Sequence, residues 1–78
     1  MGKKYSDKQK SFLVKLGERI RTLRLEKGIS QEKLASLSEI DRSYLGKVER
    51  AESNISILSL KKILEVLGVS ASKLFEED

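Results

Sequence analysis

The stretch "SQEKLASLSEIDRSYLGKVER", residues 30–50, carries the pattern that decides the fold of this chain. Ser30 and Asp41 are residue types that accept hydrogen bonds from the unpaired N–H groups at the start of a helix. Each is followed by a short run in which apolar residues recur at helical spacing. The stretch therefore predicts two short helices, over residues 31–38 and 42–50, joined by a tight turn. The expected buried side of the first helix is Leu34, Ala35 and Leu37.

The second of these helices combines an apolar anchor with an exposed basic face. Leu45 and Val48 lie three residues apart and would fix the helix from behind. Ala35 permits a close crossing of the two helices, and Ile40 is expected to fill the gap at the turn. Such a helix suits the major groove of DNA, where an arginine fork matches the two acceptors of guanine. The exposed face would consist of Arg42, Ser43, Gly46, Lys47 and Arg50.

Gly46 lowers the helix propensity of this segment by about 1 kcal/mol relative to alanine. That cost is explained if the helix backbone must approach a partner closely. The alternatives are plain tolerance of the glycine, or close packing against another helix of the same chain.

A long helix is predicted before this stretch, over residues 7–27. Ser6 and Gln9 have the spacing of a capping box at its start, and Gly28 fits the left-handed position just past its end. Its apolar side would be Phe12, Leu16, Ile20 and Leu23. The basic residues expected to point away from that side are Lys15, Arg19, Arg21 and Arg24.

Two more helices are predicted after the stretch. Ser56 would cap a helix over residues 57–67 that stops at Gly68, and Ser70 would cap a short one over residues 71–75. Five helices with short connections predict an all-α fold, a compact five-helix bundle.

The bundle is expected to be a single domain over residues 7–78, preceded by a flexible basic arm at residues 1–6. The opening "MGKKYS" matches the pattern for N-terminal myristoylation, but a basic arm explains it better.

The composition argues against several classes of function. The 78 residues carry a net charge of +4 and contain neither cysteine nor histidine. The usual neutral-pH base and the strongest nucleophile are missing, so no enzyme, metal site or cofactor is expected. The absence of cysteine suits a reducing cytoplasm, where the protein is expected to act. No apolar run approaches the roughly 20 residues of a membrane span. Residues 1–28 carry nine basic against three acidic residues, which suggests a face toward a polyanion, although a solvated surface explains charge alone equally well.

Residues 17–75, from "GERIRTLRLEKGIS" to "LGVSASKLF", resemble the lambda-repressor-like, or xenobiotic-response-element-type, helix-turn-helix domains of bacteria and phage. Within that family, "DRSYLGKVER" followed by "SNIS" and a short fifth helix is most similar to the controller proteins of restriction–modification systems. The resemblance implies a lambda-repressor-like fold and a double-stranded DNA partner. The implied base-reading residues are Arg42, Ser43, Tyr44 and Lys47. The implied phosphate-binding residues are Ser30, Gln31, Arg50, Ser53 and Asn54.

The same resemblance assigns Glu49 a mainly structural role, bonded to the first helix or to the loop that follows. The chain departs from the family pattern at two places. The turn carries Glu39 where the family usually has glycine or asparagine, which would cost about 1 kcal/mol if the position is left-handed. The loop carries Ala51 and Ser53 where many controller proteins have glycine and arginine, so one DNA contact is expected to be missing.

A second copy of the chain is expected, because one such helix reads only about four or five base pairs. The C-terminal third has more apolar surface than a small bundle buries easily, which favours a homodimer built on the last two helices. The alternative is that the last helix folds over Leu58 and Val66. The expected dimer residues are Leu58, Leu64, Val66, Leu67, Val69, Leu74 and Phe75. The acidic end, residues 76–78, would lie away from DNA.

The expected function is a homodimeric, sequence-specific transcription regulator on a pseudo-palindromic operator, which activates and represses its own operon if it is a controller protein. By family analogy, RNA polymerase would be touched by Glu32, Glu39 and Glu49. One alternative is a phage-type or antitoxin-type repressor. Another is a protein-binding module that has lost DNA binding, which the basic exposed face argues against. No small-molecule ligand is expected, because side chains fill so small a core.

Overall fold

Each helix of the structure begins at a side-chain oxygen, as the sequence predicts. Ser6, Ser30, Asp41, Ser56 and Ser70 each accept a hydrogen bond from a backbone N–H two or three residues ahead. The computed structural model describes residues 4–76, and this part of the chain contains five α-helices and no strand. Their bounds are α1 Asp7–Glu26, α2 Gln31–Leu37, α3 Arg42–Glu49, α4 Ile57–Leu67 and α5 Ala71–Leu74. The all-α, five-helix prediction is confirmed.

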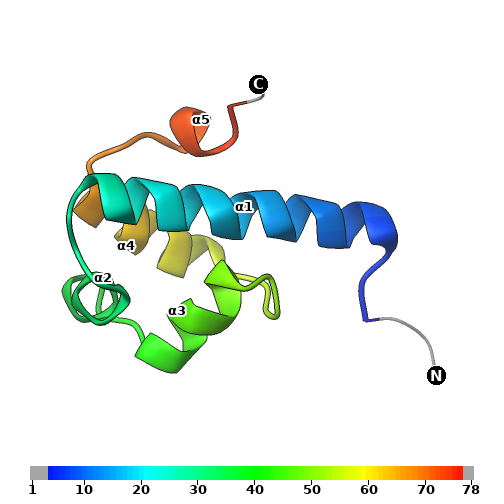
Figure 1. Cartoon of the computed structure of the whole chain (residues 1–78), viewed down its shortest axis with the longest axis horizontal. Helices are drawn as coiled ribbons and strands as arrows, with labels where there is room; N and C mark the ends of the chain where they lie inside the picture. The colour runs from blue at the N-terminus through cyan, green and yellow to red at the C-terminus, as the bar shows by residue number, and fades with distance from the viewer. Residues whose placement is uncertain (1–3, 77–78) are drawn as a thin grey trace.

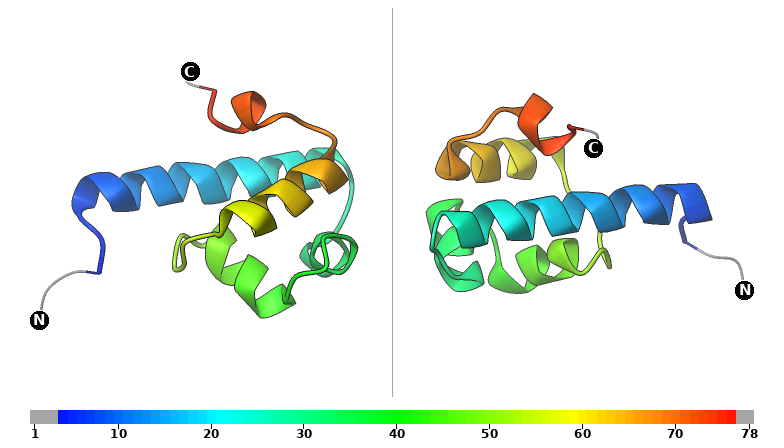
Figure 2. Two further views of the ribbon diagram at one scale, coloured as in Figure 1. Left: turned by 180° about the vertical axis from the view of Figure 1, so that it is seen from behind. Right: turned by 45° about the horizontal axis from the view of Figure 1, so that its top comes forward.

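Helix α1 is a long rod that crosses the whole molecule, with α3 packed on one side and α5 on the opposite side (Figure 1). α2 packs against both α3 and α4. The first turns of α1 extend beyond the other helices, next to the loop between α3 and α4, in all views (Figure 2). The centre of the bundle is formed by Ile20, Leu34, Leu45, Ile63 and Leu74, which are fully buried.

The helix ends differ slightly from the prediction. Four of the five predicted ranges run one residue too far, because Lys27, Ser38, Arg50 and Phe75 are the C-terminal cap residues of α1, α2, α3 and α5. The two glycine stops are confirmed, since Gly28 has φ +75° and Gly68 has φ +71°.

Two residues predicted to be buried are exposed. Phe12 is 54% exposed and Leu37 is 50% exposed. A shift of one residue turns a helical stripe by about 100°, and only packing decides between neighbouring stripes. Phe12 instead stacks on Phe75, with the ring centroids 5.8 Å apart, and so holds the end of α5 against α1. The buried residues of α1 are Leu13, Leu16, Gly17, Ile20 and Arg24.

Gly17 sets the distance between α1 and α3. A Cβ atom added to Gly17 would lie 2.6 Å from the carbonyl oxygens of both Val48 and Glu49. A side chain of any size therefore cannot fit unless the backbone of one helix moves. Ala35, the residue predicted to permit a close helix crossing, is buried as expected, whereas the close contact at Gly17 was not predicted.

Two non-glycine residues adopt the left-handed conformation, Glu39 with φ +57° and Ala51 with φ +61°. Both occupy positions at which the chain departs from the family pattern. The backbone therefore keeps the left-handed conformation at each place, at a cost of about 1 kcal/mol per residue.

Residues 1–3 and 77–78 lie outside the described part of the chain. Gly2 of the myristoylation pattern, half of the predicted arm and the last two acidic residues therefore lie there too. Within residues 4–76, no helix is long and apolar enough to cross a membrane, and no three acidic, cysteine or histidine residues are grouped to hold a metal ion.

Candidate nucleic-acid interface

Helix α3 has an apolar side in the core and a basic side in solvent. Leu45 and Val48 are buried, as predicted, and they fix α3 against the rest of the bundle. The opposite side is open along the first turns of the helix. It carries three of the four predicted base-reading residues, Arg42, Ser43 and Lys47, all of them exposed.

Asp41 fixes the start of α3. Its Oδ1 atom accepts the backbone N–H of Ser43 at 2.9 Å and the Ser43 hydroxyl at 3.0 Å. These hydrogen bonds, the backbone one above all, hold the pKa of the Asp41 carboxyl below its usual range. Because the Ser43 hydroxyl donates to Asp41, its oxygen is left as an acceptor, the type of group that reads the amino donors of adenine or cytosine.

Tyr44, the fourth predicted base-reading residue, is half-buried. Its phenol oxygen accepts a hydrogen bond from the backbone N–H of Ser56 at 3.0 Å. Ser56 is the N-cap of α4, so Tyr44 ties the start of α3 to the start of α4. This structural contact was not predicted, and it leaves the phenol proton available for donation.

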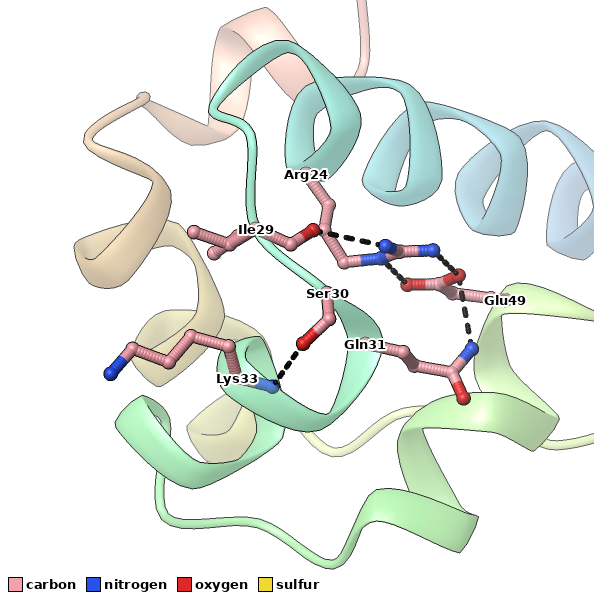
Figure 3. A network of polar contacts seen from close by, with 6 residues as sticks. All are labelled: Arg24, Ile29, Ser30, Gln31, Lys33 and Glu49. Atoms are coloured by element: carbon pink, nitrogen blue, oxygen red, sulfur yellow. Dashed lines mark hydrogen bonds and ion pairs between the residues drawn. The ribbon is translucent and has the colours of Figure 1, made fainter.

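A buried ion pair connects α1, α2 and α3 (Figure 3). The Arg24 guanidinium donates to both carboxylate oxygens of Glu49, at 2.8 and 3.0 Å, and to the backbone carbonyl of Ile29 at 3.1 Å. The Gln31 amide donates to the same carboxylate at 3.2 Å. Gln31 directly follows Ser30, the N-cap of α2. The network therefore holds the predicted phosphate ligand Gln31 in place from behind.

The network corrects two predictions and confirms a third. Arg24 is predicted to point away from the apolar side of α1, but its side chain is only 9% exposed. The Glu49 side chain is 3% exposed, so it is not available to RNA polymerase. The predicted structural role of Glu49, bonded to the first helix, is confirmed. Arg24 follows Ile20 by four residues, and this spacing was the signal in the sequence that it lies on the buried side.

Gly46 provides the space in which two predicted phosphate ligands meet. A Cβ atom at Gly46 would lie 3.1 Å from Nη1 of Arg50 and 3.2 Å from Oε1 of Gln31. These neighbours are side chains of the same chain, on α2 and at the end of α3. Gly46 is therefore buried by packing within the chain, which corrects its predicted place on the exposed face of the helix.

Replacing Gly46 with alanine is expected to weaken DNA binding without lowering the stability of the fold. Alanine favours a helix by about 1 kcal/mol, and the side-chain ends of Gln31 and Arg50 can move, so the melting temperature should stay the same or rise. Both side chains would leave their positions, which should weaken DNA binding about fivefold, the equivalent of one hydrogen bond. Circular dichroism and a DNA titration measure the two effects. A lower melting temperature with unchanged affinity would contradict this assignment.

The loop between α3 and α4 holds the other predicted phosphate ligands. Asn54 is exposed, and its Oδ1 atom accepts the backbone N–H of Ile55 at 2.8 Å. The Ser53 hydroxyl donates to the Asn54 carbonyl at 3.2 Å. Arg50 is also exposed, but its guanidinium is bonded to both carboxylate oxygens of Glu52, at 3.0 and 3.3 Å. The predicted phosphate ligands of this loop thus lie together beside α3, and the Glu52 carboxylate lies among them.

Helices α4 and α5 leave an apolar groove on another part of the surface, lined by Ile57, Leu60, Leu64, Val69 and Phe75 among others. Ile57 is 82% exposed and Leu58 is 65% exposed, so the last helix does not cover Leu58. Among the other predicted dimer residues, Phe75 is exposed and Leu64, Val66 and Val69 are half-buried. Leu67 and Leu74 are buried in the core, which corrects their assignment as direct dimer contacts.

Known proteins share this architecture. The helix-turn-helix family matches residues 20–74. The chain is 35% identical over 65 residues to the control protein C.MunI from a Mycoplasma species, which covers 82% of this chain and 88% of that protein. The crystal structure of the restriction–modification controller protein C.AhdI from Aeromonas hydrophila superposes with a TM-score of 0.81 and 48% identity, over 83% of this chain and 98% of that chain.

A second solved structure contains DNA. The restriction–modification controller protein C.Esp1396I, as a tetramer in complex with its natural 35-base-pair operator, superposes with a TM-score of 0.74 and 44% identity, over 82% of this chain and 84% of that chain. The matches span the two helices of the turn and most of the bundle around them. The chain therefore belongs to the helix-turn-helix family, in the group that includes the controller proteins of restriction–modification systems.

Proposed function

We propose that this protein is a homodimeric transcription regulator that binds a pseudo-palindromic DNA operator, and that it is the controller of a restriction–modification system. The observation that carries the proposal is the side of α3 on which Arg42, Ser43 and Lys47 are exposed to solvent. Leu45 and Val48 hold the helix from behind. A helix anchored in this way can enter the major groove. Such a regulator acts in the bacterial cytoplasm, at the nucleoid.

The phosphate-binding part of the proposal rests on residues that surround α3. Gln31 lies at the first position of α2, where backbone N–H groups and the helix dipole favour an anion. Arg50 and Asn54 follow the end of α3, and Arg50 lies close to Gln31 over Gly46. Phosphate contacts beside the last turn of a recognition helix would fix its position on the DNA, while base contacts select the sequence.

The dimer part of the proposal rests on the apolar groove between α4 and α5. Exposed Ile57 and Leu58 on one short helix are costly to leave in water, and a second copy would cover them. A two-fold dimer would set two α3 helices about one DNA turn apart. An operator with two such sites fits a tetramer, the form in which C.Esp1396I was solved on its operator.

Two related proposals have less support. The first is that the exposed side chains of Glu32 and Glu39 contact RNA polymerase. A phage-type repressor is the second candidate function, because an immunity repressor of Bacillus phage phi105 is 33% identical over 63 residues, although the match covers only 44% of that protein.

The proposed function is tested by selecting bound sequences from a random duplex pool at about 150 mM salt, which suppresses purely electrostatic binding. An inverted repeat with half-site centres about one helical turn apart is the expected result. Binding that shows no sequence preference and vanishes with salt would favour a protein-binding relative of the fold.

The Arg42→Ala variant is expected to relax the sequence preference at one or two positions in each half-site. The loss of a bidentate contact to guanine costs about 1–3 kcal/mol of discrimination. Lys15→Ala is the matched control, because Lys15 is exposed on the side of α1 that faces away from α3. The control should keep the full motif. If both variants select the same sequences as the wild type, Arg42 does not read bases.

A further inference from the structure

A carboxylate lies in the middle of the basic groups at the end of α3. Glu52 accepts two hydrogen bonds from Arg50, from Nε at 3.0 Å and from Nη2 at 3.3 Å. Both side chains are about half exposed. The lysine Lys10, from the first turns of α1, donates to the backbone carbonyl of Ala51, directly before Glu52.

The position of Glu52 is fixed by the way α3 ends. Ala51 is left-handed and donates its N–H to the Val48 carbonyl at 3.0 Å, while the N–H of Glu52 donates to the Lys47 carbonyl at 2.8 Å. These two bonds form a Schellman motif, a common helix end. They turn the chain so that Glu52 comes back beside the last turn of α3.

Glu52 is also under the influence of three cations. The hydrogen bonds from Arg50 are the main cause that holds the pKa of the Glu52 carboxyl below its usual range, and the charges of Arg50, Lys10 and Lys47 act in the same direction. Glu52 is therefore ionised at neutral pH. One carboxylate therefore lies among cations from α1 and α3, of which Arg50 is a predicted phosphate ligand.

The ion pair is not needed to hold the loop. The loop is fixed by the Schellman bonds, by the Asn54 side chain bonded to its neighbour, and by the hydrogen bond between Tyr44 and Ser56. Exposed ion pairs also contribute little to stability. A role for Glu52 must therefore be sought in binding.

We propose that Glu52 is a specificity-determining residue. In the free protein its carboxylate occupies the place on Arg50 that a DNA phosphate takes in the operator complex. Glu52 thereby weakens binding to DNA that offers no aligned phosphate. Carboxylate and phosphate both present two oxygens to the guanidinium fork, so one can replace the other. When α3 is seated in its operator, the adjoining phosphate displaces Glu52. On unrelated DNA the pair stays closed, and Arg50 makes no contact with a phosphate. The proposal rests on the proposed DNA-binding function.

The test compares wild type and Glu52→Gln on two duplexes of equal length, the selected operator and an unrelated sequence, over a range of salt concentrations. On the unrelated duplex the affinity of the variant should rise about five- to tenfold at low salt, and the plot of log affinity against log salt should steepen by about one, since Arg50 gains a phosphate contact. On the operator the affinity should rise less than about twofold.

Two further variants serve as controls. Glu26→Gln removes the same charge from an exposed position on α1. Glu26 lies nine residues, or two and a half helical turns, after Gly17, so it is on the side of α1 that faces away from α3. It should change binding to both duplexes slightly and equally. In an Arg50→Gln background, Glu52→Gln should have no more effect than Glu26→Gln, because the carboxylate acts through Arg50.

The outcomes separate this proposal from the proposed function. Suppose that the wild type prefers its operator, but that Glu52→Gln raises the affinity for both duplexes equally or changes neither affinity more than the control does. The role of Glu52 is then overturned, and the proposed function stands. If wild type itself shows no preference for any sequence, the proposed function fails and this proposal fails with it. Melting curves of Glu52→Gln should match those of the wild type.

Discussion

The Gly17→Ala variant is expected to lose about 3 kcal/mol of unfolding free energy, at the upper end of the usual cost of overpacking. The added Cβ atom would lie 2.6 Å from two backbone carbonyl oxygens of α3, and neither can move without shifting the helix. A domain of 78 residues has about 5 kcal/mol to lose. Thermal unfolding followed by circular dichroism should show a melting temperature about 15 °C lower.

Gly46→Ala is the matched control for this experiment, because it makes the same substitution in a helix where the neighbours are flexible side-chain ends. Alanine favours a helix at both positions, so helix propensity alone would stabilise both variants. Opposite changes in melting temperature would show that the contact with the backbone of α3 decides the outcome. A Gly17→Ala variant as stable as the wild type would mean that α1 and α3 lie farther apart than described.

The helix starts could be predicted because they depend on local chemistry. The residue that caps a helix contacts N–H groups only two or three residues away, and all five predicted caps make these bonds. The left-handed stops at Gly28 and Gly68 are equally local. The left-handed position at Glu39 was expected only from the family pattern, and the one at Ala51 was not predicted, since neither residue type favours this conformation.

The buried side of α1 could be predicted only in part: Leu16 and Ile20 are buried as expected. Nearer the start of the helix, apolar residues at 12, 13 and 14 offer three neighbouring stripes. Only the packing of α3 against Gly17 selects the stripe that contains Leu13. The same selection brings Arg24 inside and leaves Phe12 for α5. Leu45 and Val48 alone predicted the exposed residues Arg42, Ser43, Lys47 and Arg50, but Gly46, expected on the same face, is buried. The pairing of Arg50 with Glu52 depends on the turn after α3.

Replacing Arg24 with methionine is expected to cost about 3–5 kcal/mol, because the Glu49 carboxylate would remain buried without its partner. Only the Gln31 amide would still bond to it. The variant should keep about 0–2 kcal/mol of unfolding free energy, so that up to about half of it is unfolded at 25 °C. Urea titration followed by circular dichroism would show this loss. A variant with nearly wild-type stability would mean that water reaches Glu49 in solution.

The double variant Arg24→Met, Glu49→Leu is expected to recover most of that stability without recovering DNA binding. Replacing both members of a buried ion pair by apolar residues of similar volume is often neutral or stabilising. Gln31, however, would lose the carboxylate that holds its amide, while α2 and α3 stay in place. Operator affinity should therefore remain about tenfold below wild type, the equivalent of one charge-assisted contact. If affinity returns together with stability, the ion pair serves the fold alone, and Gln31 does not depend on it to meet a phosphate.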